Sequence, residues 1–296
     1  MLFAAACSAP PTAQTPVSNT AIPVFDHIFV LVLENRSYPD VIGSREMPRL
    51  NALAKENTLL TQYTGVTHPS LPNYIALISG DTHGIENDCK DCFVNAENLA
   101  DRLEAAGRKW KTYQEDMPEA CFLGNDGEYM QKHNPFVYFD SVRQNQERCA
   151  SSVVPLTTLE ADLASGNLPD FALIVPNMCN NGHDCSATVA DEWIGGMVDM
   201  LRQSPAVQQT RYLIVVTYDE SALQKGILGF FQRLSGRATE RIATVLIAPD
   251  AQTGFEDATP YNHYSLLKTI LLAWDLPPLG HTADETVTAI RAPWKP

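Results

Sequence analysis

The feature that most constrains the fold is a series of short apolar segments that alternate with segments of helical periodicity. The apolar segments lie at residues 27–33, 171–177, 211–220 and 241–249. The first of them, HIFVLVL, is continuously apolar after its first residue, which is typical of a parallel strand covered on both faces. Helical patterns occupy residues 47–57, 95–107, 156–166, 187–204 and 264–274. This alternation predicts an α/β fold with a doubly wound, mainly parallel sheet sandwiched by helices.

Capping and turn residues mark the ends of several of these elements. Asn95 is a candidate cap for the helix at 95–107, which Gly107 would end, and Gly166 would end the helix at 156–166. Residues 109–114 are expected to form a further short strand. Residues 115–155 are polar and irregular, so we expect a loop-rich cap insertion there. One α/β domain over residues 25–296 is therefore predicted, after an N-terminal segment of residues 1–24.

The N-terminal segment resembles the end of a bacterial lipoprotein signal. Apolar residues 2–6 precede Cys7, which would be lipidated after cleavage, and the Pro-, Ser- and Thr-rich residues 8–23 would form a flexible tether. No basic region precedes the apolar run, and a plain apolar tail is the alternative. No other run reaches the ~18 apolar residues that a membrane-spanning helix needs. We expect an exported protein that is periplasmic, anchored to the outer membrane, or secreted.

Besides Cys7 the chain holds an even set of cysteines at positions 89, 92, 121, 149, 179 and 185. In an exported chain such a set indicates disulfides, and pairing of nearest neighbours predicts Cys89–Cys92, Cys121–Cys149 and Cys179–Cys185. A zinc site at the C-x-x-C of residues 89–92 is the alternative. No second C-x-x-C or C-x-x-H follows at the spacing of a zinc finger, so disulfides are preferred.

Charge excludes two classes of partner. The formal net charge is −14. Nucleic acid and anionic membrane surfaces are bound largely through electrostatic attraction, and for this chain the electrostatic force would instead be repulsive. An anionic substrate would need a local positive field, and a bound metal ion is the simplest source. Membrane contact is expected only through a lipid anchor at Cys7, and the chain is expected to be a monomer.

Polar residues follow three of the predicted strands at the points where the strands end. Glu34 and Asn35 follow the first, Asn177 follows the second with His183 and Asp184 shortly after, and Asp219 and Glu220 end the third. An acidic pair after a single strand is commonly a solvated turn. Because ligands bind at the carboxyl ends of parallel strands, the three sets together indicate a functional site.

The stretch THPSLPNYIALISG, residues 67–80, has two interpretations. Ser70 can be the cap of a helix whose first turn contains Pro72. It can also be a nucleophile at a helix N-terminus, where backbone N–H groups and the helix dipole favour a phosphate. The two roles are compatible. His263 similarly lies at the entrance of the last predicted helix.

The ordered segments ENRSYPDVIG, THPSLPNY, VPNMCNNGHD, VTYDE and NHYSLLKTI resemble the bacterial phosphoesterase family of secreted acid phosphatases and phospholipases C. The run from Ser70 to His-Gly-Ile at residues 83–85 is similar to the nucleophile segment of nucleotide pyrophosphatases in the alkaline phosphatase superfamily. The resemblance covers residues 25–275.

The resemblance implies a role for each matching residue. Ser70 matches the nucleophile, and the metal ligands would be Glu34, Asn35, Ser70, Asp219 and Glu220. His183 and His263 would be catalytic, as phosphate ligands or as the acid for the leaving group. Substrate contacts would come from Asn87, Asn177, Lys132, His133 and Asp184, although Asn87 stands one residue short of the family spacing.

The predicted ligand set contains only oxygen donors, which suits one hard cation. Ca²⁺ or Mg²⁺ is favoured over Mn²⁺ and Zn²⁺, since zinc usually takes His or Cys. With one metal, the histidines would act as cations below their ordinary pKa of ~6.5, which predicts an acidic optimum. His27 and His281 are assigned ordinary structural roles, and no role is assigned to His68.

Together these observations predict a metal-dependent acid phosphatase that hydrolyses phosphate monoesters through a phosphoserine intermediate. Its substrate would be a small phosphorylated molecule such as a nucleotide, a sugar phosphate or a phosphoinositide. One alternative is a phospholipase C or another phosphodiesterase, for which residues 222–233, with Phe230 and Phe231, could form an apolar lip rather than pack in the core. The other is a non-catalytic surface lipoprotein that binds a ligand.

Overall fold

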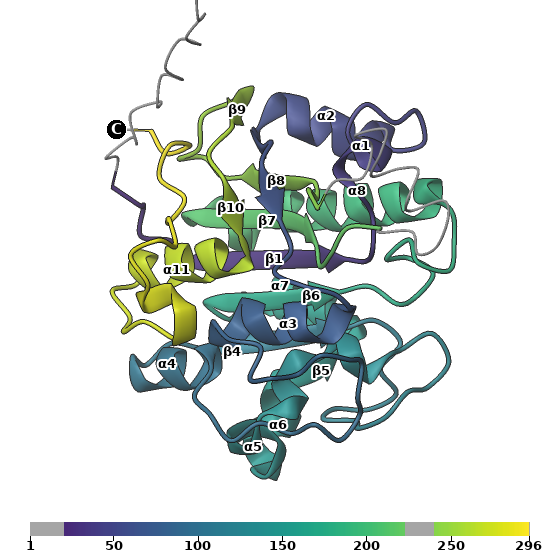
Figure 1. The fold of residues 1–296 in the computed structure, drawn as a ribbon, viewed down its shortest axis with the longest axis vertical. Coiled ribbons are helices and arrows are strands. Elements are labelled where there is room, and N and C mark those ends of the chain that lie inside the picture. The colour runs from purple at the N-terminus through teal and green to yellow at the C-terminus, as the bar shows by residue number, and fades with distance from the viewer. Residues whose placement is uncertain (1–20, 223–239, 296) are drawn as a thin grey trace, which may run out of the picture.

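A computed structural model describes residues 21–222 and 240–295 of the chain. One sheet of eight strands runs through the molecule in the order β5-β4-β6-β1-β7-β8-β2-β9 (Figure 1). A separate pair of short strands, β3 and β10, lies beside it. The strands of the main sheet are β1 (His27–Leu33), β2 (Thr58–Leu60), β4 (Trp110–Gln114), β5 (Val153–Pro155), β6 (Phe171–Val175), β7 (Tyr212–Tyr218), β8 (Thr244–Ile247) and β9 (Phe255–Asp257). The pair comprises β3 (Tyr63–Thr64) and β10 (Tyr261–Asn262).

Strand β1 lies at the centre of the sheet and explains why its sequence is continuously apolar. It pairs in parallel with β6 and β7, so that Val30 lies opposite Leu173 on one side and Val215 on the other. All three side chains are fully buried because helices cover both faces of the sheet. Burying a side chain of this kind stabilises the fold by about 1.5–3 kcal/mol relative to leaving it exposed.

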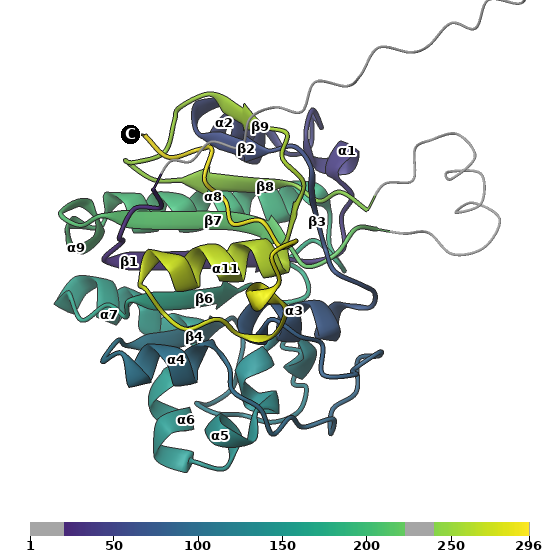
Figure 2. The same cartoon turned by 60° about the vertical axis from the view of Figure 1, so that its left-hand side comes forward.

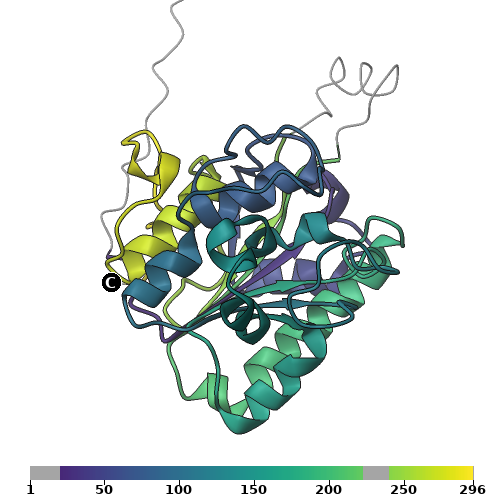
Figure 3. The ribbon, with the colours of Figure 1, turned by 90° about the horizontal axis from the view of Figure 1, so that it is seen from below.

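Helices form a layer on each face of the sheet, as the view from below makes clear (Figures 2 and 3). Helices α3, α4 and α11 lie on one face and α7 and α8 on the other. Their bounds are α2 (Pro48–Glu56), α3 (Ser70–Ser79), α4 (Leu99–Ala105), α7 (Leu159–Ser165), α8 (Ala187–Gln203) and α11 (His263–Ala273). Shorter helices are α1 (Tyr38–Val41), α5 (Asp140–Arg143), α6 (Gln146–Ser152) and α9 (Pro205–Gln208), with 3₁₀ turns η1 (Gln131–His133), η2 (Pro135–Tyr138), η3 (Leu156–Thr158) and η4 (Gly280–Ala283).

The predicted fold class, a doubly wound and mainly parallel sheet between helices, is confirmed. The exception to parallel pairing is β8, which runs antiparallel to both β7 and β2. The predicted cap of the helix at 95–107 is wrong. The helix starts at Leu99 with Asn98 as its cap, because the Asn98 side chain accepts from the Ala100 N–H and Asp101 accepts from the Asn98 N–H.

The segment expected to be an irregular insertion, residues 115–155, contains η1, η2, α5 and α6. Its last residues form β5, which extends the sheet by pairing in parallel with β4. The turns η1 and η2 pack against α3, so this segment reaches the helix that starts at Ser70. It therefore supplies side chains to the site described below.

The predicted disulfide pairing is confirmed at all three positions. Cys89 pairs with Cys92, Cys121 with Cys149, and Cys179 with Cys185. The thiols of residues 89 and 92 are therefore not zinc ligands in this structure. Disulfides of this kind fit a protein that reaches an oxidising compartment.

Two of the predicted features lie outside the described residues. Cys7 and its tether belong to residues 1–20, and Phe230 and Phe231 belong to residues 223–239. Among the helices of residues 21–222 and 240–295, none combines the length and the apolar character needed to cross a lipid bilayer.

Candidate active site

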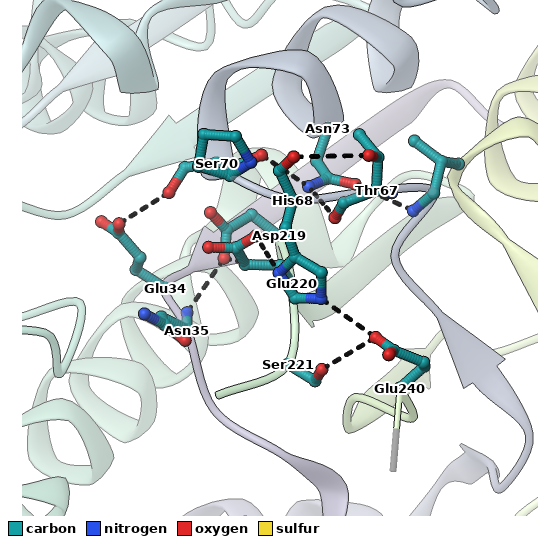
Figure 4. A network of polar contacts seen from close by, with 12 residues as sticks. Glu34, Asn35, Thr67, His68, Ser70, Asn73, Asp219, Glu220, Ser221 and Glu240 are labelled. Atoms are coloured by element: carbon teal, nitrogen blue, oxygen red, sulfur yellow. Dashed lines mark hydrogen bonds and ion pairs between the residues drawn. The ribbon is translucent and has the colours of Figure 1, made fainter. Parts of the chain in front are cut away.

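The candidate active site forms where β1 and β7 end. Leu33 and Tyr218 lie opposite each other in the parallel pairing, and the Asp219 N–H donates to the Leu33 carbonyl at 2.9 Å. The next residues, Glu34 and Asp219, are consequently brought together at the carboxyl edge of the sheet (Figure 4). Both side chains are almost completely buried.

Ser70 is the first residue of α3 and lies against this edge. The loop before it is held by Asn73, whose side-chain oxygen accepts from the Val66 and Thr67 N–H groups and whose amide donates to the Thr67 and Pro69 carbonyls. The prediction that Ser70 caps the helix is wrong, because Pro69 occupies the N-cap position. The Ser70 hydroxyl does not cap the helix, and it donates a hydrogen bond to Glu34.

Glu34 is the centre of the polar contacts at the site. Its Oε1 accepts from Ser70 Oγ at 2.8 Å and from Lys132 Nζ at 2.9 Å. Its Oε2 forms an ion pair with His133 Nε2 at 2.5 Å and accepts from Asn181 Nδ2 at 3.3 Å. Burial raises the pKa of Glu34, but the charges and hydrogen bonds of His133 and Lys132 outweigh it and hold that pKa well below its ordinary value. These two neighbours therefore favour the carboxylate form of Glu34.

Asp219 is a buried carboxylate with one oxygen left unpaired. Its Oδ1 accepts from the Asn35 N–H at 2.9 Å and from the Glu220 N–H at 2.6 Å. Its Oδ2 is buried and has no hydrogen-bond partner among the described residues. Burial raises the pKa of Asp219 well above its ordinary value, and the nearby charges of Glu34 and Glu220 raise it further. A buried, partnerless carboxylate oxygen of this kind is destabilising unless a cation or proton binds it.

The donor chemistry fits the predicted divalent cation. Glu34, Asp219 and Glu220 place three acidic side chains close enough together to raise the pKa of Asp219, and Asn35 and Ser70 add neutral oxygen donors. As they stand, no three His, Cys, Asp or Glu side chains of residues 21–222 and 240–295 are arranged to hold a metal ion. The site would therefore depend on the amide and hydroxyl oxygens as well as on the carboxylates.

His68 connects the site to a second acidic residue. His68 Nδ1 lies 2.5 Å from Glu220 Oε2, and His68 Nε2 lies 3.0 Å from Glu240 Oε2, which also accepts from Ser221 Oγ. The hydrogen bond to Glu220 raises the pKa of His68 to about 9, with a further contribution from Glu240 and against the effect of burial. No role was assigned to His68 from the sequence.

His263 lies at the site but in a different state from the one predicted. It is the first residue of α11, fully buried, with Nε2 2.6 Å from the Asp219 carbonyl and Nδ1 3.2 Å from the Tyr63 hydroxyl. Burial lowers its pKa to about 4, although the carbonyl contact opposes the shift. The expectation that His263 acts as a cation below pH ~6.5 is therefore wrong, because burial disfavours the charged form of the imidazole.

Asn177, His183 and Asp184 form hydrogen bonds with residues other than Ser70, Glu34 and Asp219. Asn177 donates from its backbone to Glu115 and from its side chain to Asp116. His183 and Asp184 contact each other, with Nδ1 and Oδ1 2.5 Å apart, and both are substantially exposed. In the part of the chain that the structure describes, none of the three side chains forms a hydrogen bond or ion pair with Ser70, Glu34 or Asp219. Asn181, from the same loop, contacts Glu34 instead and was not singled out from the sequence.

Asn87 is exposed, and its neighbour Asp88 makes the contact beside Ser70. Asp88 Oδ1 accepts from the Leu71 N–H at 3.0 Å, and Asp88 Oδ2 lies 3.3 Å from Lys132 Nζ. Asn87 stands one residue short of the family spacing after His-Gly-Ile, and Asp88 has that spacing. The spacing was therefore the signal in the sequence that could have indicated Asp88.

The fold is similar to that of solved structures that include a member of the alkaline phosphatase superfamily. An alkaline phosphatase superfamily protein from Vibrio parahaemolyticus superposes with a TM-score of 0.58 at 14% identity, covering 88% of this chain and 71% of that one. The phosphonate monoester hydrolase of Silicibacter pomeroyi has a TM-score of 0.58 at 13% identity, covering 90% and 76%. At these identities the likeness concerns the fold alone.

The sequence comparisons identify the family. The sequence model of the Phosphoesterase family matches residues 43–277, and the chain belongs to that family. It is similar to an acid phosphatase of Aspergillus fumigatus, with 35% identity over 90% of this chain and 58% of the relative, and to a probable acid phosphatase of Kluyveromyces lactis, with 33% identity over 97% and 67%. A phosphatidylinositol-3-phosphatase of Mycobacterium tuberculosis is 29% identical over 92% of this chain and 84% of that one. The chain thus spans little more than half of the Aspergillus relative.

Proposed function

We propose that this chain is a metal-dependent acid phosphatase that hydrolyses phosphate monoesters through a phosphoserine intermediate on Ser70. The observation that carries the proposal is the hydrogen bond from the buried Ser70 hydroxyl to Glu34, with Lys132 Nζ 3.4 Å from the same oxygen of Ser70. Membership of the Phosphoesterase family and the names of the fungal relatives support it.

The first step of the proposed mechanism is attack by Ser70. Its proton is directed to Glu34, and Lys132 Nζ donates to one lone pair of the oxygen, so the other lone pair is left for the phosphorus atom. The Ser70 Oγ–P bond forms as the Ser70 proton passes to Glu34, the bond from phosphorus to the leaving oxygen breaks, and the departing alkoxide takes a proton from water. Lys132 is placed to neutralise charge that develops on the phosphate oxygens. In the second step water attacks phosphorus, the Oγ–P bond breaks, and Ser70 takes back the proton held by Glu34, while the proton of the water leaves with the phosphate.

A divalent cation, Ca²⁺ or Mg²⁺, would be held by Glu34, Asn35, Ser70, Asp219 and Glu220, and it would lower the pKa of the Ser70 hydroxyl and neutralise phosphate charge. The unpartnered Asp219 Oδ2 supports this assignment. In the structure Lys132 Nζ and His133 Nε2 contact the two oxygens of Glu34.

The proposed substrate is a small phosphorylated molecule. The name of the mycobacterial relative makes a phosphoinositide one candidate beside nucleotides and sugar phosphates. Export, a lipid anchor at Cys7 and a monomeric state belong to the same proposal, and the disulfides support export.

Hydrolysis of 4-nitrophenyl phosphate and of its bis-ester, from pH 4 to 9, tests the proposal. We expect turnover of the monoester at acid pH, loss of that turnover in EDTA, and recovery when Ca²⁺ or Mg²⁺ is added. A preference for the bis-ester would identify a phosphodiesterase such as a phospholipase C. Hydrolysis of neither ester with any cation would favour a non-catalytic ligand-binding protein.

A further inference from the structure

Asp88 occupies the two hydrogen-bond donors that flank the nucleophile. Its Oδ1 accepts from the Leu71 N–H at 3.0 Å, and its Oδ2 lies 3.3 Å from Lys132 Nζ. Leu71 is the second residue of α3, where backbone N–H groups lack intrahelical partners and the helix dipole attracts anions. Lys132 Nζ is itself 3.4 Å from Ser70 Oγ. A carboxylate therefore sits where these two donors converge, next to the attacking oxygen.

These are the donors that an oxygen of a bound phosphate would use. A phosphate that reaches Ser70 therefore meets the Asp88 carboxylate at close range. The Asp88 side chain is 32% exposed and lies on the loop before the Cys89–Cys92 disulfide, so it has room to move when a ligand binds. The Lys132 side chain is more enclosed, at 19% exposed.

The charged groups around Asp88 do not remove the repulsion between its carboxylate and a bound phosphate. Lys132 from η1 is its ion-pair partner, and Lys132 is already shared with Glu34 from β1. Burial raises the pKa values of Tyr74 from α3 and Tyr138 from η2, and the nearby Asp88 charge raises them further, so neither hydroxyl adds a charge here. On its own loop Asp88 has the charged neighbours Glu86, Lys90 and Asp91. Lys132 thus forms ion pairs with two carboxylates even when no phosphate is bound.

We propose that Asp88 is a specificity-determining residue that makes the phosphate site select a phosphate group carrying a proton over the fully ionised dianion. This inference rests on the proposed function. A dianion has no proton to share with the Asp88 carboxylate and is repelled by it. A monoanion can donate its P–OH to Asp88, while its other oxygens accept from Lys132 and the Leu71 N–H.

With this selection, the acidic pH optimum of hydrolysis would depend partly on the ionisation of the substrate. The second ionisation of a phosphate monoester has a pKa of ≈ 6, so the monoanion predominates only below that pH. His263 does not supply the acidic limb as a cation, because its pKa is about 4. Asp88 would thereby give the site a preference for acid conditions without a histidinium.

Binding of inorganic phosphate by isothermal titration calorimetry tests the inference without any need for turnover. The full chain with Mg²⁺ is compared with Asp88→Asn at pH 5 and pH 8. The amide of this variant keeps an acceptor for the Leu71 N–H and removes the negative charge. We expect the variant to bind phosphate at least about tenfold more tightly than wild type at pH 8 and within about threefold of it at pH 5.

Sulfate, which carries no proton at either pH, is the matched anion, and we expect Asp88→Asn to bind it more tightly than wild type at both pH values. Glu86→Gln, on the same loop and exposed, controls for net charge and should match wild type. Unchanged or weaker phosphate binding by Asp88→Asn at pH 8 would overturn the inference while the proposed function stands, provided that wild type binds phosphate and hydrolyses the monoester. Wild type that neither binds phosphate nor hydrolyses the monoester would overturn both.

Discussion

Ser70 and Glu34 lie 36 residues apart in the sequence, and the hydroxyl of the first donates to the carboxylate of the second at 2.8 Å. The contact joins the start of α3 to the end of β1, and both side chains are buried. A serine at a helix start is usually engaged with its own helix, whereas this one is turned towards a carboxylate that Lys132 and His133 keep ionised. This relationship makes Ser70 a candidate nucleophile.

Glu34→Gln should reduce kcat/KM for 4-nitrophenyl phosphate by about 10²–10³-fold, because the amide cannot serve as the charged acceptor of the Ser70 proton. The change also leaves Lys132 and His133 without their buried counter-charge, which costs about 3–5 kcal/mol of unfolding free energy. Steady-state kinetics and urea unfolding measure the two effects. Glu56→Gln, at an exposed glutamate of α2, should change neither. Wild-type kinetics in Glu34→Gln would remove Glu34 from the mechanism.

Lys132→Met should reduce kcat/KM by about 10²-fold, since the ammonium group beside Ser70 would no longer neutralise the phosphate in the transition state. Lys132→Arg should recover part of this loss, because it restores the charge with a different shape. The initial rates at pH 5 over a range of substrate concentrations give both numbers. Lys90→Met, at an exposed lysine near Asp88, is the control for net charge. Equal rates for Lys132→Met and Lys90→Met would contradict the assignment.

Cation binding should stabilise the protein, because Asp219 Oδ2 is buried without a partner in the described residues. At a hundred times its Kd the cation would add about 2.7 kcal/mol. The pKa of Asp219 is raised, so protons compete with the cation at low pH, and the rise in Tm on adding Ca²⁺ or Mg²⁺ should be larger at pH 8 than at pH 5. Thermal melts with EDTA and with each cation measure this.

The variant for that experiment is Asp219→Asn, which should lose the response to the cation. Asp126→Asn, at an exposed aspartate, should keep it. A cation response of the same size in wild type and in Asp219→Asn would place the cation elsewhere.

His68 should make the cation-free protein more stable at acid and neutral pH than at alkaline pH. Its pKa is about 9 in the folded chain, raised chiefly by Glu220, against an ordinary value of 6.5. A raised folded pKa gives stability that is fully present below pH ~6.5 and is lost as pH rises through about 9. In EDTA, the Tm of wild type should therefore exceed that of His68→Gln at pH 6, and the difference should disappear near pH 10. A difference independent of pH would mean that His68 does not hold its proton through Glu220.

Much of the fold could be predicted because the sheet is buried on both faces. Continuous apolar runs such as residues 27–33 are typical of parallel strands that are buried on both faces. The three-residue strands β2 and β9 were not predicted, because such short segments carry no periodicity of their own. The reversed direction of β8 depends on pairing between distant segments, which a local pattern does not encode.

The candidate site was predictable where residues directly follow a strand, as Glu34 and Asp219 do. For side chains on the longer loops, local hydrogen bonding decides orientation, and the sequence does not show it. Asn177 and His183 are satisfied by neighbours within a few residues or by Glu115 and Asp116. The neutral state of His263 follows from complete burial, which a residue list does not reveal.

The central claim is that Ser70 is phosphorylated during turnover, and acid quench of the enzyme with saturating substrate, followed by peptide mass spectrometry, tests it most directly. The reaction is stopped over the first turnovers at pH 5 in the presence of Mg²⁺. We expect a phosphate group on the peptide that contains Ser70, its disappearance when substrate is exhausted, and none in Ser70→Ala, whose turnover should fall by at least about 10³-fold. A Ser70 peptide that stays unmodified throughout, together with a Ser70→Ala variant that hydrolyses the monoester within about tenfold of wild type, would contradict the account.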